Sequence, residues 1–300
     1  MPSRVSTAQI FSHGRAHVSQ ARSKEMVSAE KAGSLKEINR PSEDPSGWIM
    51  AQNLKGNVAV ADAIAKNASL ASSTLAATEN IIERLNEYVQ KAHELALSVS
   101  GLNFANESIR GPALEQMKGI YDLTMQALNT KYGDRVLLSG FKSPGMAFDE
   151  QGNFLGNSTP FEVEVAPGKR MAVNINAEQA ISGQGSQESV NVPVLFRRLI
   201  DGLQNADQEK VQSTLGEFAK AVDQLSTARG QIGARMSEIE RSLTAHGSER
   251  ITTVGHISKI EDADAIKIFS DLAKDQTVLR SAVSTTQKIL SETPPDILFK

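Results

Sequence analysis

Two pairs of polar residues have the types and spacing that could bind a catalytic metal ion. His93 and Glu94 match the start of the zinc-protease pattern His-Glu-x-x-His, but position 97 is Leu, so the second zinc ligand is missing. His13 and His17 are four residues apart and would share one face of a helix, a spacing that allows metal chelation. No carboxylate lies near them in the sequence. A histidine metal-binding protein therefore stays an alternative interpretation.

Oxygen-bearing residues alternate in a way that is typical of calcium loops at one place in the chain. These residues are Asp149, Gln151 and Asn153. The glycine that follows Gln151 stands at the wrong offset, and no acidic residue closes the loop where calcium would need it. We therefore expect the turn of a hairpin that links Phe148 to Phe154.

The acidic cluster formed by Glu261, Asp262 and Asp264 has no second cluster that would complete a metal site or an acid/base pair. Acids favour the N-terminal turn of a helix because they interact well with the helix dipole, so we expect such a turn here. Neither a phosphate-binding loop nor a dinucleotide-binding glycine pattern is present, since Gly183 and Gly185 lack a third glycine. The chain has no cysteine, which excludes disulfides, thiolate zinc sites and cysteine nucleophiles. The sequence predicts a protein that is not an enzyme and has no cofactor or metal.

The charge balance is weakly acidic, with 32 Lys and Arg against 35 Asp and Glu. A nucleic-acid-binding protein would normally carry a strongly basic face, so we expect no nucleic-acid partner. No run of about eighteen apolar residues occurs, which predicts no membrane insertion. Residues 1–24 contain Arg and Lys but no acid, which also fits an organelle transit peptide, whereas the apolar segment of a cleaved secretory signal is missing. Any export is expected to leave the N-terminus intact.

A long helix is predicted to begin within residues 42–47, which read Ser-Glu-Asp-Pro-Ser-Gly. Asp44 can cap this helix, and Pro45 suits its first position because the missing N–H needs no partner there. Apolar and small residues then recur every three or four positions over 54–99, until Gly101 breaks the pattern. Such a spacing is typical of a coiled-coil seam.

After a second predicted helix, which opens at Gly111-Pro112, the pattern changes to that of β-structure. Apolar residues alternate with acids over 161–165, a Pro-Gly turn follows, and apolar residues alternate again over 171–175. This pattern predicts a β-hairpin with one buried face and one acidic face in water. We therefore expect a small β-rich inserted domain at residues 140–189.

Helical spacing returns in the last third of the chain. It begins at Pro193, pauses near residues 205–207 and continues as a second seam over 211–243. A further stretch over 265–290 keeps the same spacing until a Pro-Pro pair ends it.

The seams at 54–99 and 211–243 each need a partner stripe, which decides the predicted fold class. We expect a mainly α protein, a long antiparallel helical bundle or coiled-coil rod built from both termini, with a small β-rich inserted outer domain. The predicted parts are an N-terminal arm at 1–40, a helical rod domain at 41–139 plus 190–260, the insert at 140–189 and a C-terminal helical arm at 261–300.

The two arms carry apolar residues that are too sparse to form a core by themselves. We expect residues 1–35 to be mobile in the monomer and to become helical only in an assembly, because other molecules must cover these side chains. The predicted assembly interface takes apolar residues from both arms: Val5, Ile10, Phe11, Val18, Phe269, Leu272, Leu279, Val283 and Leu290.

Three stretches of the sequence resemble one known family. Residues 39–45, Asn-Arg-Pro-Ser-Glu-Asp-Pro, resemble an Asn-(Arg)-Pro-Ser-Asp-Asp-Pro element of the bacterial hook–filament junction proteins, the family of hook-associated protein 3 or FlgL. Residues 134–143, Asp-Arg-Val-Leu-Leu-Ser-Gly-Phe-Lys-Ser, are similar to that family's passage from helix into outer domain. Residues 228–235, Ala-Arg-Gly-Gln-Ile-Gly-Ala-Arg, are similar to its Ala-Arg-Ala-x-Val-Gly-Ala-Arg helix. Residues 260–264 are shared in style with the wider flagellin superfamily.

The resemblance implies a structural component of the bacterial flagellum that is extracellular and serves motility. Such a protein would be secreted through the flagellar type III apparatus with the help of an export chaperone. It would contact hook-associated protein 1, flagellin and copies of itself, with its terminal helices in the inner tube and its β-rich insert outside. Flagellin itself, a self-polymerising filament subunit, is the nearest alternative. The chain departs from the family pattern at residues 30–36 and 292–300.

Overall fold

The computed structural model describes residues 7–101, 104–141, 145–184 and 189–291. Contacts between residues divide the chain into two compact units. We call residues 1–60 and 249–300 the terminal unit, and residues 61–248 the central unit. The four-part division expected from the sequence stays a prediction.

The first long helix of the body, α2 (Pro45–Val99), begins where its capping residues predict. Asp44 Oδ1 accepts hydrogen bonds from the backbone N–H groups of Ser46 at 3.1 Å and Gly47 at 3.0 Å. These bonds satisfy two donors that the first turn of a helix leaves unpaired. Every seam position predicted between residues 64 and 99 is buried, which confirms this part of the seam.

Helix α3 (Glu107–Leu128) begins one turn earlier than the Gly-Pro pair had indicated. Asn106 caps it by accepting a hydrogen bond from the N–H of Ser108 at 3.0 Å. Pro112 therefore lies inside the helix, where its ring removes one backbone hydrogen bond. The Asn cap determined the start of the helix, and the proline did not.

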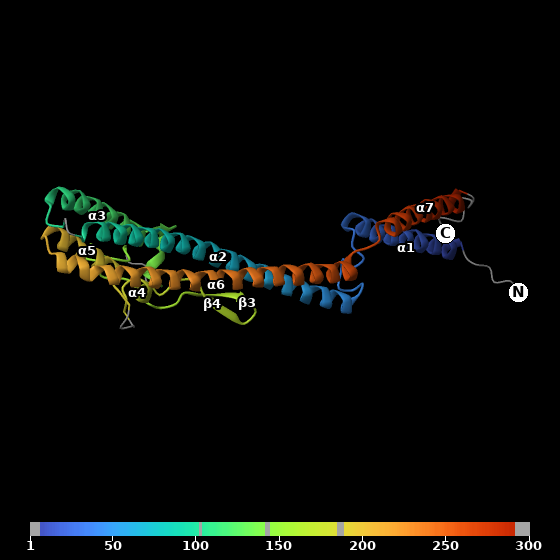
Figure 1. Ribbon diagram of the computed structural model, residues 1–300. Helices are drawn as coiled ribbons and strands as arrows, with labels where there is room; N and C mark the ends of the chain where they lie inside the picture. The colour runs from blue at the N-terminus through green and yellow to red at the C-terminus, as the bar shows by residue number, and fades with distance from the viewer. Residues whose placement is uncertain (1–6, 102–103, 142–144, 185–188, 292–300) are drawn as a thin grey trace. The chain divides into compact units, whose positions relative to one another are not determined.

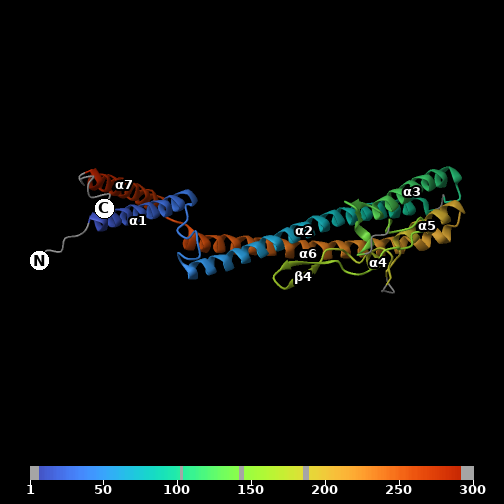
Figure 2. The same ribbon diagram turned by 180° about the vertical axis from the view of Figure 1, so that it is seen from behind.

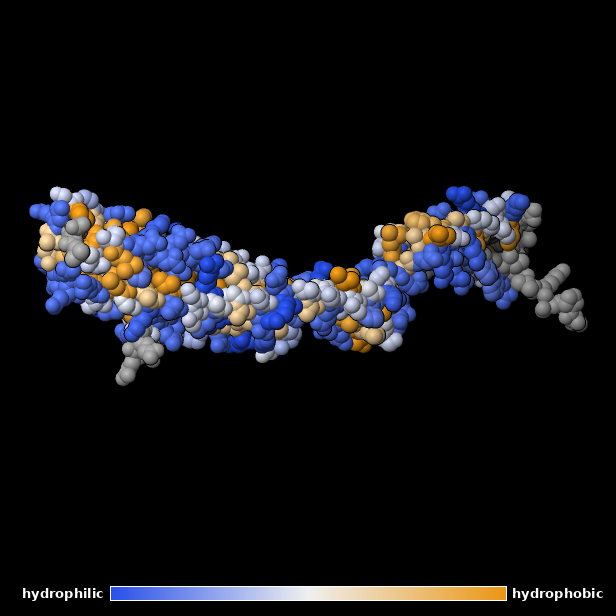
Figure 3. Space-filling view, in the orientation of Figure 1, coloured by the Kyte–Doolittle hydropathy of each residue, from blue (hydrophilic) through white to orange (hydrophobic). Residues whose placement is uncertain are grey.

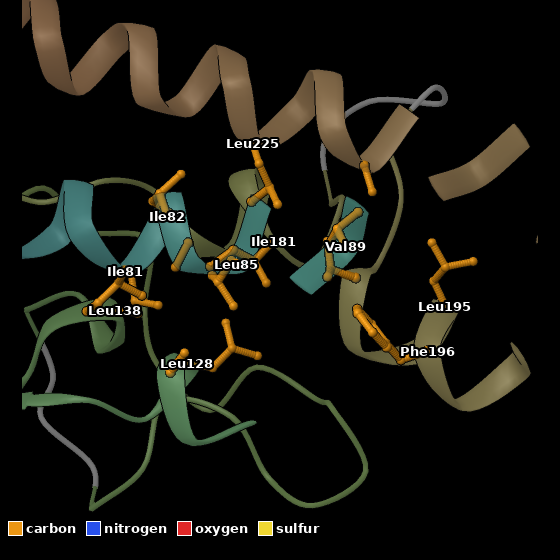
Figure 4. Close-up of a cluster of buried hydrophobic side chains, with 14 of the residues drawn as sticks. Ile81, Ile82, Leu85, Val89, Leu128, Leu138, Ile181, Leu195, Phe196 and Leu225 are labelled. Atoms are coloured by element: carbon orange, nitrogen blue, oxygen red, sulfur yellow. The ribbon is translucent and has the colours of Figure 1, made fainter. Parts of the chain in front are cut away.

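Helices α2, α3, α5 (Val192–Gln204) and α6 (Gln208–Glu261) share the hydrophobic core of the central unit (Figure 1). Phe196 of α5 packs edge-to-face on Phe218 of α6, with ring centroids 5.5 Å apart, and Tyr121 of α3 lies 6.4 Å from Phe196. His93 of α2 stacks on the same Phe218. Figure 4 shows side chains from all four helices converging in this core. The two predicted seams are therefore partners in the central unit.

Between α3 and α5 the chain forms the predicted β-rich insert. The strands β3 (Glu162–Ala166) and β4 (Lys169–Ala172) pair as an antiparallel hairpin around a turn whose Gly168 has a φ of +72°. Phe148 and Phe154 form the bridge of a second hairpin, as predicted. Three small elements lie between α3 and the predicted start of the insert: β1 (Lys131–Tyr132), β2 (Arg135–Val136) and the 3-10 helix η1 (Leu137–Ser139). The short helix α4 (Ala177–Ala180) lies within the insert.

The terminal unit contains α1 (Thr7–Ser34) and α7 (Ala265–Ser291), together with the start of α2 and the end of α6. Helix α7 lies where the spacing over 265–290 predicts a helix. Helix α1 occupies most of the N-terminal arm, whose mobility in the free monomer stays a prediction. Among the helices of the described residues, none is long and apolar enough to span a bilayer. The chain is mainly α-helical with a small β insert, as its sequence indicates.

Candidate assembly interface

The helices α1 and α7 pack side by side within the terminal unit, as both views show (Figures 1 and 2). Ser28 Oγ donates a hydrogen bond to Asp275 Oδ2 at 2.6 Å. A Cβ on Gly14 would lie 3.3 Å from Thr286 Cγ2. The contact partners run in opposite directions along the two helices, so the pair is antiparallel. Since Gly14 has no side chain, the two helices approach closely there.

The surface between α1 and α7, which we call the terminal seam, has mainly small or polar side chains on α1 and larger apolar ones on α7. On α1 the less exposed positions recur every three or four residues: Gly14, Val18, Ala21, Glu25 and Ser28. On α7 the less exposed positions include Ile268, Leu272, Asp275, Leu279, Ala282, Val283 and Thr286, and most of the apolar ones are only partly buried. Such a seam removes little apolar surface from water, so the pair gains little stability from its own contacts.

The structure places the predicted interface residues in two different environments. Four of them are half-buried: Val18, Leu272, Leu279 and Val283. Two aromatic residues are at the surface, Phe11 with 39% and Phe269 with 54% of its area exposed. The rest lie outside what the structure describes, Val5 entirely and Ile10 and Leu290 in their side chains. Whether these residues bind a neighbour stays a prediction.

A second set of apolar residues on α1 and α7 faces solvent, and we call it the exposed apolar face. Its members are Phe11, Met26, Val27, Ile266, Phe269 and Val278. Figure 3 shows hydrophobic side chains at the surface of this helix pair. The interface predicted from the sequence does not include Met26, Val27, Ile266 and Val278, although each is a large apolar residue beside the seam positions. Large apolar side chains that remain in water on one helix pair are typical of surfaces that bind another molecule.

At its inner end the helix pair is closed by a joint, which we define as residues 35–37 and 261–263. The backbone N–H of Glu37 donates to the carbonyl oxygen of Glu261 at 2.7 Å. The N–H of Ala263 donates to the carbonyl oxygen of Leu35 at 3.1 Å. These two bonds tie the turn after α1 to the turn after α6.

Glu261 is the buried charged residue of the joint, with only 1% of its area exposed. Its two carboxylate oxygens pair with Lys36 Nζ at 3.2 Å and with Lys55 Nζ at 2.5 Å. Burial acts to raise the pKa of Glu261, but the hydrogen bonds from Lys55 and Lys36 outweigh it and hold that pKa below its ordinary value. The carboxylate is therefore ionised at neutral pH and bound on both sides.

The sequence predicts that the acids near residue 261 lie in the first turn of one helix. In the structure they lie at the ends of two different helices. Asp264 caps α7 by accepting hydrogen bonds from the N–H groups of Ile266 at 2.9 Å and Lys267 at 3.3 Å. Glu261 instead ends α6. Its partners are more than 200 positions away in the chain, so no local sequence signal could have found them.

The candidate metal and calcium residues do not gather into a site in the described part of the chain. His13 and His17 are exposed on α1, and no group of three or more His, Asp or Glu side chains that could hold a metal occurs among the described residues. Asp149 Oδ1 accepts hydrogen bonds from the N–H groups of Gln151 and Asn153, so it closes the turn of the predicted hairpin.

Comparisons with known proteins agree on one superfamily. Residues 5–143 match the model of the bacterial flagellin N-terminal helical region. The flagellin of Listeria monocytogenes is 22% identical over 258 residues, which cover 85% of this chain and 84% of that protein. The chain is therefore similar to flagellins, in its N-terminal helical region and at low identity over most of its length.

Solved structures share the fold at low identity. A protein assigned as a flagellar hook-associated protein from Vibrio parahaemolyticus has a TM-score of 0.68 and 20% identity, and the match covers 73% of this chain and all of that one. Bacillus cereus FlgL has a TM-score of 0.59 and 18% identity, with 67% of this chain and 96% of that one covered.

These similarities indicate the general role of the chain, that of an axial structural protein of the extracellular bacterial flagellum, which assembles with other flagellar proteins. In a protein that works by assembly, the exposed apolar face and the joint are the features that require a functional explanation.

Proposed function

We propose that this protein is a hook–filament junction subunit, which joins hook-associated protein 1 to flagellin and contacts copies of itself. It does so by offering the terminal helices α1 and α7 to its neighbours. Export through the flagellar type III apparatus with a dedicated chaperone belongs to the same proposal. The resemblance of residues 39–45, 134–143 and 228–235 to the junction family supports this choice.

The observation that carries the assembly mechanism is the contrast between the two units. The described hydrophobic core cluster lies in the central unit, between residues 68 and 239. In the terminal unit, apolar residues as large as Met26, with 62% exposed, and Ile266, with 84% exposed, face solvent. Burying one such side chain fully contributes about 1.5–3 kcal/mol, so covering this face by a neighbour would drive assembly.

A second candidate function is that of the filament subunit itself. It is favoured by the similarity to flagellins, which extends over 85% of the chain in the Listeria protein. Both functions use terminal helices to assemble, so the exposed apolar face does not distinguish between them. The two candidate functions differ in whether the purified protein polymerises into filaments by itself.

Deletion of the gene separates the two candidates. For a junction subunit we expect cells with hooks, no attached filaments and flagellin released into the medium, as seen by electron microscopy and by blotting the medium. For a filament subunit we expect hooks with their junction proteins but no flagellin in the medium, and the purified protein should polymerise into long filaments. The latter pair of results would overturn the junction proposal.

Replacement of Phe269 tests whether the exposed apolar face is the contact surface. Phe269→Ser should leave the denaturation midpoint of the monomer nearly unchanged, because the ring is largely in water already. It should still lower the number of filaments restored in the deletion strain. Leu70→Ser is the matched control, since Leu70 is similarly exposed, at 59%, on α2 of the central unit. Equal effects of the two variants would contradict a special role for this face.

A further inference from the structure

The position of Glu261 is not explained by the stability of its own helix. A helix carries partial negative charge at its C-terminal end, so a carboxylate there is disfavoured. Glu261 is the last residue of α6, and it is buried as well, which adds a desolvation cost. A lysine, or an uncharged residue, would suit this position better if only the helix mattered.

The partners of Glu261 show what its carboxylate connects. Lys36 lies in the turn between α1 and α2, and Lys55 lies three turns into α2. Both lysines keep access to water, with 41% and 37% of their side chains exposed, while the carboxylate is enclosed. One buried anion therefore ties the end of α6 to two points on the other half of the terminal unit.

The rest of the joint leaves the helices little freedom to turn. Residues 262–264 are the entire connection between α6 and α7, and Asp264 is already used as the cap of α7. On the other side Leu35, which is not a glycine, has a φ of +56°, a strained value that the surrounding structure must hold. The backbone bonds from Glu37 and Ala263 cross between these two turns.

We propose that Glu261 is a positioning residue for assembly, which fixes the direction in which α1 and α7 leave the joint and so presents their exposed apolar face to one neighbouring subunit. The inference rests on the proposed function only in assuming that α1 and α7 form the contact. The ammonium groups of Lys36 and Lys55 are the two counterions of the Glu261 carboxylate. Glu261 touches no neighbour itself and acts through the turns that it holds.

Glu261→Gln in the full-length protein tests the proposal, because it keeps the shape of the side chain and removes its charge. Hydrogen exchange of the amides of Glu37 and Ala263 should become faster by about ten- to a hundredfold, since removing one partner leaves buried groups poorly paired. Exchange in the central core should not change. In the deletion strain the variant should restore clearly fewer attached filaments than the wild type.

The matched control is Glu79→Gln, which removes a carboxylate that pairs with Arg229 in the central unit. This control should restore filaments like the wild type. A double variant with Glu261→Lys and Lys55→Glu exchanges the two charges. It should restore more attached filaments than Glu261→Gln does. A side chain that only filled space at position 261 would not give this recovery.

Two results would overturn the proposal. One is full attachment by Glu261→Gln, or a loss no larger than that of the control. The other is equally faster exchange in the core, which would make Glu261 a general stabilising residue. Failure of the junction function is a separate outcome, because the deletion strain would then release no flagellin into the medium, whatever the variants of Glu261 do.

Discussion

Gly140 is required by the backbone at the point where the chain leaves η1 for the rest of the insert. It has a φ of +74°, and a Cβ at this position would collide with the carbonyl oxygen of Asn157. The same Asn157 accepts a hydrogen bond from the N–H of Phe141 through its side chain, so it is not free to move away. The middle position of the Ser-Gly-Phe sequence at residues 139–141 therefore requires glycine, because a residue with a Cβ does not fit there.

Replacement of this glycine should destabilise the central unit. We expect Gly140→Ala to lower the free energy of unfolding by about 2 kcal/mol or more, through backbone strain and overpacking. Gly119→Ala is the control, because Gly119 lies within α3 with nothing near the added Cβ. It should raise the stability by about 0.5–1 kcal/mol, since alanine favours the helix. Denaturant midpoints measured by circular dichroism would show a loss for one and a gain for the other; two losses of equal size would contradict the explanation.

Glu261 also predicts how the joint responds to acid. Its pKa is lowered in the folded protein, although burial acts to raise it, because the hydrogen bonds from Lys55 and Lys36 favour the ionised form. A lowered pKa contributes stability that is fully present above the ordinary value of 4.5 and is lost as the pH falls through the lower folded value. Protonation should therefore loosen the joint only below about pH 4.5.

The measurement is the exchange protection of the Glu37 amide, taken relative to its rate in an unfolded peptide at each pH. In the wild type this protection should fall at acid pH, whereas in Glu261→Gln it should be low and nearly independent of pH. The other charged groups around the joint, the Lys31–Glu37 pair and Asp262, are at its edge and remain in both proteins. A pH dependence that persists in Glu261→Gln would assign the effect to those groups instead.

Helix α6 supplies one side of the core, and its polar side chains also form hydrogen bonds to the backbone of the chain between α3 and α5. The side chain of Gln224 accepts a hydrogen bond from the N–H of Val190 at 2.9 Å. Farther along the same helix, Arg235 Nη1 donates to the carbonyl oxygen of Asn174 at 2.7 Å, and Ser242 Oγ donates to that of Val165 at 2.6 Å. The hairpin of β3 and β4 is thus fastened to the helix through its backbone.

Removal of the Arg235 guanidinium should release one end of this hairpin. We expect Arg235→Met to cost roughly 1–2 kcal/mol, since hydrogen bonds from a charged donor to buried carbonyl groups are lost. The helices should be unaffected, so limited proteolysis should cleave residues 161–175 sooner while the helical signal stays the same. Arg241→Met is the control, because Arg241 is largely exposed on the same helix and forms only a 3.9 Å pair within its own turn. Equal cleavage in both variants would show that Arg235 does not fasten the hairpin.

The helical elements could be predicted because their signals are local. The cap at Asp44, the pause near residues 205–207 and the seam over 64–99 all follow from residue types at short spacing, and each is present in the structure. The joint could not be predicted in this way, since Glu261 meets Lys36 and Lys55 only after the chain has folded. Phe269, which belongs to the interface predicted from the sequence, lies exposed on α7, because Ile268 takes the buried position next to it.

The two units of the molecule differ in how they can stay folded. The central unit buries aromatic and branched residues such as Phe148, Phe196 and Leu85 completely. Among the described residues of the terminal unit the buried apolar ones are few, namely Ala21, Ile38, Ala51 and Ile268, and two of these four are alanines. Because stability comes chiefly from buried apolar area, we expect the central unit to fold by itself and the terminal unit to need cover by neighbouring molecules.

In the dilute monomer, amide hydrogen exchange should therefore be much slower in the central unit than in the terminal unit. Amides of α2 between residues 64 and 99 should be protected nearly to the level of global unfolding, because opening them exposes the central core. Amides of α1 should exchange with little protection, since the terminal seam of Gly14, Ala21 and Ser28 provides too little burial to offset the ordering of the chain. After assembly the same amides should become protected, as neighbours cover the exposed apolar face. Strong protection of α1 in the dilute monomer would mean that the terminal pair is satisfied by its own contacts, and the proposed mechanism of folding on assembly would then be wrong.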